Sequence, residues 1–389
     1  MKRRIAIVTG SRAEYGLLSR LIRLLAEDGR TEPLVVVTGT HLAPEFGMTV
    51  TEIEAEGVAI AERVEIVLAS DSGLGMAKSL ALATMGLAEA FARLTPDLVL
   101  VFGDRYEMLG AASAAMALRL PLAHIAGGQL TEGAVDDAIR HAITKLAHLH
   151  FTAIEAYGRR IVQMGEAPER VFVVGSTGLD AIRDGQRLPR AELEARLGLD
   201  LGQRSLLVTF HPETLSALAP ERQVAELLAA LAGIEDDVRL IFTGVNADAG
   251  GRAIAAAVEA FVATRPGRAV AVKSLGHQGY LSALALVSGV VGNSSSGLIE
   301  VPSFGIGTVN IGDRQKGRLR AASIIDCPTE AAAIAAALRR LLSPGFRAGL
   351  AGLVNPFGDG HASERIRDIL ATHPLDGLIR KSFVDTPSP

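Results

Sequence analysis

The sequence predicts an α/β protein with two Rossmann-like domains, each built on a parallel sheet. A chain of 389 residues that is 49% hydrophobic and 21% charged can bury a large core, but it is too long for one doubly wound sheet. Its strand-like runs are continuously apolar rather than alternating, which is typical of parallel strands covered on both faces. The alternation of strands and helices pauses after Gly175 and then restarts. Two halves joined near residues 176–190 would leave a ligand cleft between them.

The first half follows the order expected for βαβ units. Short apolar runs predict strands at Arg4–Thr9, Pro33–Thr38, Arg63–Leu68, Asp97–Phe102, Leu122–Ile125, Leu149–Thr152 and Val171–Val174. Apolar residues at helical spacing predict helices at Tyr15–Glu27, Leu74–Leu94, Met108–Leu118 and around residues 136–145. We therefore expect the first domain to span residues 1–178.

The second half opens with a polar helix, Arg190–Leu197, and then repeats the pattern. Strands are predicted at Ser205–Phe210, Val238–Phe242, Val270–Lys273, Gly289–Gly292 and Gly307–Ile311. The second domain is expected to span residues 179–364. A last helix, Ala362–Ala371, leads into a tail, and we expect residues 365–389 to pack back on the first domain.

Composition excludes several classes of protein. The net charge is −4 and no basic stripe is present, which disfavours a nucleic-acid partner. The lone cysteine, Cys327, fits a reducing compartment and excludes disulfides or a thiolate metal cluster. The apolar run after Arg4 is too short for a signal peptide, and no apolar stretch is long enough to cross a bilayer. We expect a cytoplasmic protein without a membrane partner.

The most informative segment is His124–Lys145, where an apolar strand runs through a glycine-rich loop into a charged helix. Asp136, Arg140 and Thr144 fall at i, i+4 and i+8. Asp137, His141 and Lys145 form a parallel row beside them. A solvated helix would scatter such charges, whereas these are focused at the mouth of a strand, where α/β folds place their chemistry.

Two loops of the first half also follow strands. Thr9–Gly16 offers Arg12 just before a helix, a place suited to phosphate, although an ordinary turn with a surface arginine explains it equally well. The G-x-G-x-x-G fingerprint is absent there, which disfavours a dinucleotide cofactor. Phe102–Glu107 places Asp104 and Arg105 directly after a buried strand, and a helix N-cap is the alternative explanation for Asp104.

Two loops of the second half offer further polar groups. His211 ends the first strand there, in FHPET, although a lone histidine at such a place is more often structural than catalytic. Gly292–Glu300 puts three serines before a helix, which favours an anion site for a diphosphate. Glu300, deeper along that helix, could accept both ribose hydroxyls. Serine N-capping is the simpler alternative, but it does not account for three serines and the glutamate.

Taken together, these motifs resemble the UDP-N-acetylglucosamine 2-epimerase family. The resemblance runs from Ile5 to about Leu370 and rests on SRAEYG, GDRYEM, HIxGG…DDAIRHAITKLAHLHF, HPET, GNSSSGLIEVPSFG, NIGDRQKGR and the GDG before His361. Within the family, the chain looks like the hydrolysing branch, whose members serve sialic-acid and legionaminic-acid synthesis.

The resemblance implies a GT-B fold, a deep interdomain cleft, no metal or other cofactor, and a homodimer or homotetramer. It also implies a reaction in which the C2 proton leaves and UDP departs from C1, giving a 2-acetamidoglucal. Water then adds with the opposite configuration at C2, releasing UDP and a free manno-type sugar. This chemistry needs two acid–base groups and positive charge for the departing diphosphate.

Functional residues carry over position by position. The resemblance implies catalytic roles for Asp104, Asp136, Asp137 and His211. It implies substrate-binding roles for Arg12, Arg105, Arg140, Asn246, His277, Ser294, Ser295, Glu300 and Arg314. The remaining histidines with no comparable context, His41, His148, His150 and His373, are expected to be structural or exposed.

One departure from the sialic-acid branch concerns the glycine-rich loop. Ala126 stands where that branch has a glutamate, and Gln129 where a glutamate often follows the glycines. The loop is longer and supplies Glu132. We expect either Glu132 or Asp136 to take over the missing acid–base role, although a favourable position at the helix start explains Glu132 equally well. Replacing Glu132 by Gln should then cut turnover by orders of magnitude. Longer loops of this kind resemble those of enzymes acting on UDP-2,4-diacetamido-2,4,6-trideoxyglucose.

Rival functions share the same nucleotide pocket. A GT-B glycosyltransferase would not need the cluster of Asp136, Asp137 and Arg140, and a non-hydrolysing epimerase resembles these motifs less. A catalytically inactive sensor of UDP-sugars would not retain Asp104 and His211. The sequence does not decide which nucleotide sugar is the substrate: UDP-N-acetylglucosamine, its 4-acetamido-6-deoxy relative and a GDP-linked version all fit.

Overall fold

The computed structural model describes residues 2–70, 72–131, 134–185, 187–213, 216–244 and 250–385. The chain divides into two compact units. Unit 1 comprises Met1–Gln129, Asp136–Ala181 and Phe357–Pro389, and unit 2 comprises Leu130–Val135 and Ile182–Pro356. The boundaries that the sequence suggested, after residues 178 and 364, lie close to two of these divisions.

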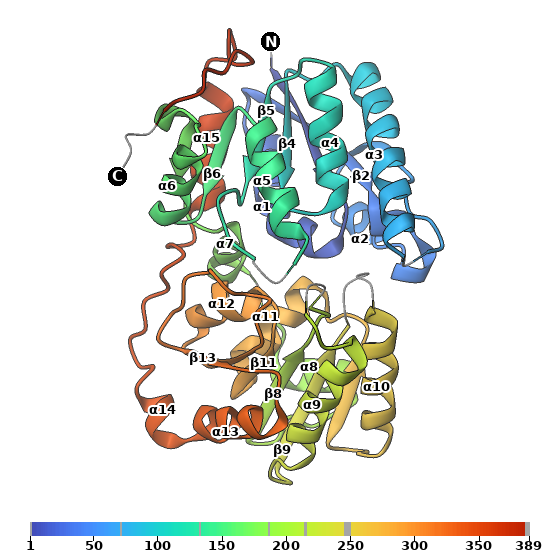
Figure 1. Cartoon of the computed structure of the whole chain (residues 1–389), viewed down its shortest axis with the longest axis vertical. Helices are drawn as coiled ribbons and strands as arrows, with labels where there is room; N and C mark the ends of the chain where they lie inside the picture. Colours follow the sequence, from blue (N-terminus) through green and yellow to red (C-terminus); the bar gives the residue numbers. More distant parts are fainter. Residues whose placement is uncertain are drawn as a thin grey trace. The chain divides into compact units, whose positions relative to one another are not determined.

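Unit 1 is built on a fully parallel sheet, which has seven strands within the described residues (Figure 1). Its strand order is β3-β2-β1-β4-β5-β6-β7. The strands are β1 (Arg3–Thr9), β2 (Thr31–Thr38), β3 (Ile60–Val64), β4 (Leu98–Phe102), β5 (Leu122–Ile125), β6 (Leu149–Thr152) and β7 (Val171–Val173).

Helices cover both faces of this sheet. They are α1 (Arg12–Glu27), α2 (Val50–Ala55), α3 (Gly73–Leu94), α4 (Tyr106–Ala117), α5 (Asp136–Leu146), α6 (Glu155–Gln163), α7 (Thr177–Asp184) and α15 (Ala362–Thr372). Alternate strand residues point to opposite faces, so Ile5 and Ile7 pack with α1 and α15, whereas Ala6 and Val8 pack with α3, α4 and α5. This two-sided burial explains why the strands read as continuous apolar runs.

Unit 2 repeats the architecture with six parallel strands among its described residues, in the order β10-β9-β8-β11-β12-β13. The strands are β8 (Arg204–Thr209), β9 (Val238–Thr243), β10 (Ala269–Val272), β11 (Gly289–Gly292), β12 (Gly307–Ile311) and β13 (Ile324–Cys327). The helices are α8 (Arg190–Leu197), α9 (Pro220–Ala232), α10 (Gly251–Ala263), α11 (Gly276–Leu286), α12 (Ser296–Ile299), α13 (Ala331–Leu342) and α14 (Pro344–Ala348). Helices α9, α10 and α13 bury one face of the sheet.

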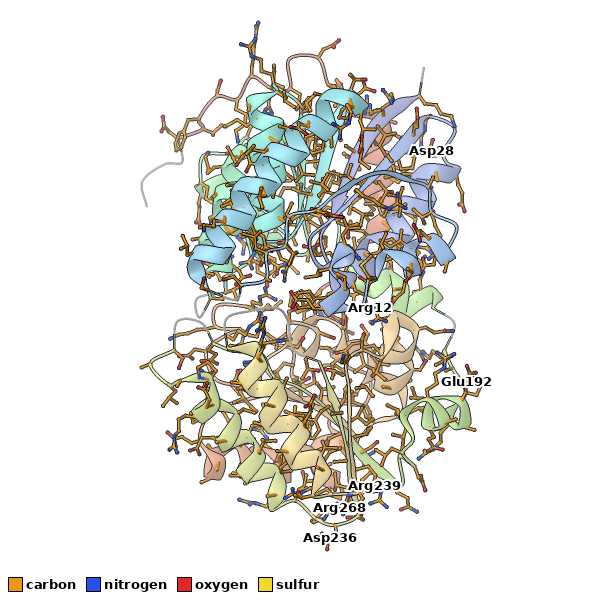
Figure 2. The ribbon with its side chains drawn as sticks, turned by 90° about the vertical axis from the view of Figure 1, so that its right-hand side faces the viewer. Arg12, Asp28, Glu192, Asp236, Arg239 and Arg268 are labelled. Carbon is orange, nitrogen blue, oxygen red and sulfur yellow. The ribbon has the colours of Figure 1, made fainter. Side chains whose placement is uncertain are left out.

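Local sequence explains where several helices begin. Ser11 accepts a hydrogen bond from the N–H of Glu14, whose carboxylate in turn accepts from the backbone of Ser11, so that a capping box starts α1. Ser72 caps α3 through the N–H of Gly75. Figure 2 shows the two ends of α1, marked by Arg12 at its start and Asp28 just after its last residue.

Two edge strands differ from the sequence prediction. The third strand of unit 1 is Ile60–Val64 rather than Arg63–Leu68, and β13 was not predicted. Both strands lie at the edge of a sheet, where partial exposure admits charged residues such as Arg63 and Asp326. The apolar run that identifies a central strand is therefore absent.

The C-terminal segment belongs to unit 1 and is fastened there by polar contacts. Asp180 accepts hydrogen bonds from the backbone N–H groups of Ala362 and Ser363 at 2.9 and 2.6 Å, which caps the start of α15. Further along, Lys381 donates to the carbonyls of Lys145 and Ala147 and pairs with the buried Glu166.

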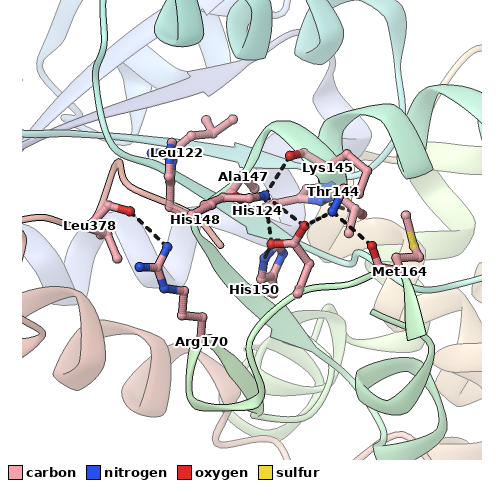
Figure 3. A network of polar contacts seen from close by, with 12 residues as sticks. Leu122, His124, Thr144, Lys145, Ala147, His148, His150, Met164, Arg170 and Leu378 are labelled. Atoms are coloured by element: carbon pink, nitrogen blue, oxygen red, sulfur yellow. Dashed lines mark hydrogen bonds and ion pairs between the residues drawn. The ribbon is translucent and has the colours of Figure 1, made fainter. Parts of the chain in front are cut away.

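Figure 3 shows a network of polar contacts in this region, with Lys145, His150 and Arg170 labelled. Glu166 also pairs with Lys145 at 2.5 Å and with His150 at 3.2 Å. Arg170 donates to the carbonyl of Leu378 at 2.9 Å. The tail is thus tied to α5, β6 and the segment before β7.

Each sheet has one topological switch point, where the strand order reverses. In unit 1 it lies between β1 and β4, and in unit 2 between β8 and β11. Ligands of open α/β sheets bind outside the carboxyl ends of the strands at such points. The loops that leave these four strands therefore define where to look for the site.

Candidate active site

At the end of β4 an acid–base cluster is organised by one buried arginine. Arg140, on α5, has a side chain that is 1% exposed. Its guanidinium pairs with Asp104, donates to Asp137 Oδ1 at 3.1 Å and donates to the carbonyl of Gln129 at 3.0 Å. The structure thus brings together Asp104, Asp137 and Arg140, three residues that the sequence placed in the site. Both carboxylates are partly exposed, so they are open to a substrate.

The buried His124 of β5 supports this cluster through contacts at both of its ring nitrogens. Its Nε2 lies 2.8 Å from the carbonyl oxygen of Gly103, which can only accept, so Nε2 carries the proton. Its Nδ1 lies 3.3 Å from Thr144 Oγ1, and Thr144 is also 2.9 Å from the carbonyl of Arg140. Burial lowers the pKa of His124 to about 3, so the ring is neutral. It fixes the loop before Asp104 against α5.

Asp136 and His141 complete the exposed side of α5. Asp136 is the first residue of the helix and is half-buried. His141 Nε2 lies 3.4 Å from Asp137 Oδ2. Burial lowers the pKa of His141, and the charge of Asp137 partly opposes this. Asp137 therefore sits between a permanent cation and a neutral imidazole.

The loop after β1 and the start of α4 hold a second charged group of side chains. Arg12, the first residue of α1, pairs with Glu52 at 2.9 Å. Arg105 pairs with Glu107 at 3.2 Å, and the Glu107 side chain is fully buried. Glu14 is also buried, and sequence reasoning singled out neither glutamate.

At the switch point of unit 2, His211 is locked to Asn293. The N–H of His211 donates to Asn293 Oδ1 at 2.7 Å, and Asn293 Nδ2 donates to the carbonyl of His211 at 2.8 Å. Arg314 and Gln315 both donate to the carbonyl of Asn293. Burial, reinforced by the charge of Arg314, lowers the pKa of His211 to about 3. His211 is therefore neutral, and sequence reasoning missed Asn293, the residue that orients it.

The serine-rich loop needs one correction. Helix α12 is a single turn, Ser296–Ile299, and Glu300 is its C-terminal cap rather than a residue deeper in a longer helix. One turn has only a small dipole, so an anion here would depend on hydroxyl and N–H groups. Ser294 and Ser295 are half-buried. A Cβ at Gly292 (φ 136°) would lie 1.8 Å from the carbonyl oxygen of Thr209, so only glycine fits before the loop.

Glu300 is placed by a chain of hydroxyl groups. Tyr280 donates to Ser296 Oγ at 2.6 Å, and Ser296 in turn donates to Glu300. Burial raises the pKa of Glu300. Ser296, the third serine of the motif, therefore orients Glu300. The first two serines, Ser294 and Ser295, precede α12 in the loop.

Three predicted site residues cannot be placed. Glu132 and Asn246 lie outside the described residues, and so does the side chain of His277, which falls in the first turn of α11. Next to Glu132, Thr131 is held within unit 2 by Arg318, whose Nη2 lies 3.1 Å from its hydroxyl oxygen. Ala126 adopts a left-handed conformation with φ 68°.

The other histidines of unit 1 have structural partners. Buried His41 lies between the hydroxyls of Thr9 and Thr49, at 3.0 and 2.8 Å. His148 Nδ1 accepts from the N–H of Leu122, and His150 pairs with Glu166. Over the described ranges no cluster of histidine, cysteine or acidic residues could hold a metal ion. None of the helices in these ranges is long and apolar enough to cross a membrane.

Fold and geometry together define a class: α/β proteins of two parallel-sheet units whose polar side chains gather at the switch points. A family model described as UDP-N-acetylglucosamine 2-epimerase matches residues 23–371. The chain belongs to this UDP-N-acetylglucosamine 2-epimerase family.

Relatives and solved structures agree with this assignment. The chain is 39% identical over 385 residues to the GDP/UDP-N,N'-diacetylbacillosamine 2-epimerase (hydrolyzing) of Campylobacter jejuni, covering 99% of both. It is 36% identical over 380 residues to the UDP-N,N'-diacetylbacillosamine 2-epimerase (hydrolyzing) of Legionella pneumophila, covering 97% of this chain and 98% of the relative. The UDP-GlcNAc 2-epimerase of Neisseria meningitidis bound to UDP-GlcNAc superposes with a TM-score of 0.81 at 17% identity, covering 94% of this chain and 99% of that one. This likeness confirms the predicted fold of two Rossmann-like parallel-sheet domains.

Proposed function

We propose that the protein is a hydrolysing UDP-sugar 2-epimerase, which converts a UDP-linked 2-acetamido sugar to the free 2-epimer and UDP. The observation that carries this function is the buried Arg140, which holds Asp104 and Asp137 at the switch point of the first sheet. Full-length relatives named as hydrolysing 2-epimerases support the same reaction.

The carboxylates fit the two proton transfers of the reaction. One group removes the C2 proton as UDP leaves C1, and a second returns a proton on the opposite face as water adds to the glucal. Asp104 and Asp137 supply two such groups, with Asp136 beside them. Asp104 and Asp137 both pair with Arg140, and a carboxyl group acts as a base in its ionised form. His211 and Glu132 are further candidates for the proton-donating role.

Unit 2 supplies the groups for the nucleotide. Ser294 and Ser295 offer hydroxyls to the diphosphate, Arg314 offers charge, and Glu300 offers a carboxyl to the ribose. Arg12 and Arg105 on unit 1, together with Asn246 and His277, complete the binding set. None of these roles needs a metal or another cofactor, because arginines and N–H groups can take the leaving diphosphate.

The glycine-rich loop favours a sugar with an acetamido group at C4. Ala126 is smaller than the glutamate of the sialic-acid branch and leaves room beside the strand end. The Campylobacter and Legionella relatives are both named for N,N'-diacetylbacillosamine, a 2,4-diacetamido-2,4,6-trideoxy sugar. We therefore propose UDP-2,4-diacetamido-2,4,6-trideoxyglucose ahead of UDP-N-acetylglucosamine, in a cytoplasmic homo-oligomer that serves nonulosonic acid synthesis of the legionaminic type.

Incubation in deuterated water tests reaction and substrate together. The purified protein would be mixed separately with UDP-N-acetylglucosamine, UDP-2,4-diacetamido-2,4,6-trideoxyglucose and the GDP-linked form of the latter. Free manno-type sugar carrying deuterium at C2, with release of the nucleoside diphosphate, is expected for the diacetamido substrate. A UDP-linked epimer would indicate a non-hydrolysing enzyme, and intact nucleotide sugar in every tube would overturn the proposal.

A further inference from the structure

Two buried carboxyl groups lie at the switch point of unit 1 and have no role in the chemistry described so far. Glu14 comes from α1 and is 6% exposed, and Glu107 comes from α4 and is fully buried. They flank Gly10, the residue after β1. A Cβ built on Gly10 would lie 3.3 Å from Glu14 Oε2 and 3.4 Å from the carboxyl carbon of Glu107.

The contacts of the two carboxyl groups are unequal. Glu14 Oε2 accepts hydrogen bonds from the N–H groups of Gly10 and Ser11, at 2.8 and 3.1 Å. Glu14 Oε1 is buried without a hydrogen-bond partner among the described residues. Glu107 accepts from Arg105 through both carboxyl oxygens, at 3.2 to 3.3 Å. Arg105 is therefore held by a carboxylate that has a second carboxyl group as its neighbour.

The site has no room for rearrangement. Gly39 adopts φ 60°, and a Cβ there would lie 2.5 Å from the carbonyl oxygen of Gly10 and 2.9 Å from Glu107 Oε1. Thr40 donates to the same Gly10 carbonyl through its N–H and its hydroxyl. The backbone of β1 and η1 (Gly39–Leu42) thus packs directly on the carboxyl groups.

Other ionisable groups around the pair come from several elements. Arg105 and Tyr106 lie at the start of α4; the charge of Arg105 lowers the pKa of Glu14, whereas burial raises the pKa of Tyr106, which is therefore neutral. Arg12 begins α1, and His41 of η1 stays neutral because burial lowers its pKa to about 4. Where α15 packs on α1, the charged groups are already matched as the ion pair between Arg20 and Glu364, at 2.6 Å.

Two ionised carboxylates and one guanidinium in this enclosed place would leave an excess negative charge. Burial first, and then the charge of Glu107, raises the pKa of Glu14 to about 7, with Arg105 partly opposing the shift. Near pH 7 the pair therefore holds about half a proton on average; it gains the proton as pH falls and loses it as pH rises, and the proton belongs to the two carboxyl groups jointly.

We propose that Glu14 and Glu107 are positioning residues that share one proton and thereby set how much positive charge Arg105 offers to the substrate diphosphate. The inference rests on the proposed function, in which Arg105 binds the substrate. With the proton present, the charges of Glu107 and Arg105 cancel, so that no net negative charge opposes an anion that binds the guanidinium. Without it, a second carboxylate lies beside Arg105 and repels the same anion. By reciprocity, the bound diphosphate favours uptake of a proton from solvent by Glu14.

The KM of the enzyme as a function of pH tests this role. Initial rates would be measured between about pH 6 and pH 9 with whichever of the two UDP-sugars the wild-type enzyme hydrolyses. The wild-type KM is expected to rise about five- to tenfold through pH 7, which corresponds to about 1 kcal/mol, the size of the repulsion between two close charges that are well screened by water. The kcat should change much less, since neither glutamate touches the reacting atoms.

Two variants separate this role from a merely structural one. In Glu14→Gln the amide oxygen still accepts from Gly10 and Ser11, but the group cannot ionise, so KM should become independent of pH. In Glu107→Gln the neighbouring charge is lost, so the KM rise should move to lower pH by about one unit or more. Glu364→Gln on α15 is the matched control and should keep the wild-type profile.

The outcomes are distinct. A wild-type KM that is flat with pH, or a Glu14→Gln profile that matches the wild type, overturns the inference and leaves the hydrolase function intact. If neither UDP-sugar is hydrolysed by the wild-type protein, the proposed function fails, and this inference fails with it. A flat Glu14→Gln profile together with a displaced Glu107→Gln profile supports it, and a misfolded Glu14→Gln protein would leave the wild-type and Glu107→Gln curves to decide.

Discussion

The two switch points share a topology but differ in how their polar groups are held. In unit 1, ion pairs organise the site: Arg140 joins Asp104 to Asp137, and Arg105 pairs with Glu107. In unit 2, the side-chain amide of Asn293 organises the site, because it makes two hydrogen bonds to the backbone of His211. The same arrangement of strand ends is thus organised by ion pairs in one unit and by an amide in the other.

The difference separates reaction from binding. A carboxyl group has to be ionised to accept a proton, and a nearby arginine favours that state. A nucleotide pocket needs rigid donors and acceptors instead, which an amide locked to the backbone provides without a charge. Removing charge should therefore damage turnover in unit 1, and removing hydrogen bonds should damage binding in unit 2.

The largest effect is expected for Asp104→Asn. The asparagine keeps the shape of the side chain but loses the charge that accepts a proton, so kcat should fall by about 10²- to 10⁴-fold. UDP release measured at saturating substrate would show this. Asp28→Asn, at the far end of α1, is the matched control. Turnover of Asp104→Asn within twofold of wild type would remove Asp104 from the reaction.

Arg140→Met should cost the most stability. It leaves Asp104 and Asp137 without their shared cation, which is expected to lower the free energy of unfolding by about 3–5 kcal/mol. Denaturant unfolding would measure the loss. Arg239→Met, at the start of β9, where Arg239 donates to the carbonyl of Asp236 (Figure 2), should change stability by less than about 0.5 kcal/mol. Equal losses for both variants would contradict the special place of Arg140.

Mild acid should destabilise both units, and unit 1 more than unit 2, because His41 and His124 lie in unit 1 and His211 lies in unit 2. Burial holds the pKa values of His124 and His211 at about 3 and that of His41 at about 4, all below the ordinary value of 6.5. The unfolded chain therefore gains protons first, and the stability that these histidines contribute above pH 6.5 is lost as pH falls toward 4. Each histidine lowers the unfolding free energy by about 1.4 kcal/mol per pH unit in this window. Denaturant unfolding curves measured between pH 7.5 and pH 5 test this prediction. An unfolding free energy that stays constant over this range would contradict the burial of the rings.

Asn293→Ala probes unit 2. Loss of the two hydrogen bonds to His211 should cost about 1–3 kcal/mol of stability and weaken UDP binding by about tenfold. Asn293→Asp keeps the acceptor for the N–H of His211 but loses the donor, so it should fall between wild type and alanine. Calorimetric titration with UDP gives the affinities, and an unchanged dissociation constant would show that Asn293 serves stability alone.

The smallest effect is expected for Ala126→Gly, and it should be a gain. Alanine at φ 68° is strained, whereas glycine adopts this conformation freely. The substitution should raise the unfolding free energy by about 0.5–1 kcal/mol, after the entropy that glycine loses on folding. Ala123→Gly, three residues earlier in β5, should destabilise instead. A loss at both positions would mean that the methyl group of Ala126 contributes packing that outweighs the strain.

The sequence was most informative where chemistry follows a strand. The family resemblance put Asp104, Asp137 and Arg140 in one site, and the strand ends of one parallel sheet meet at one edge. Helical spacing placed Arg140 in a row with Asp136 and Asp137 in the neighbouring row, whereas the structure pairs Arg140 with Asp137 and Asp104. The central strands were predictable because both of their faces are buried. Edge strands β3 and β13 were not, because exposure makes their composition resemble that of loops.

The supporting residues were hidden for a different reason. Glu14, His124 and Glu107 read as ordinary members of a helix, a strand and a helix, because no local pattern marks a polar side chain as buried. Asn293 was overlooked beside three serines, although it is the residue that makes contact with His211. Burial of polar groups depends on contacts between segments that are distant in sequence, which only the folded chain reveals.

The return of the C-terminal segment to unit 1 has a consequence for biosynthesis. Ile366, Leu370 and Leu378 complete the core on the α1 face of the first sheet, yet they are made after all of unit 2. Nascent chains grow at about 5–20 residues per second, so that face stays uncovered on the ribosome for on the order of ten seconds. The sheet that carries the acid–base cluster is thus begun first and closed last, and its exposed apolar face is where a chaperone would bind the growing chain.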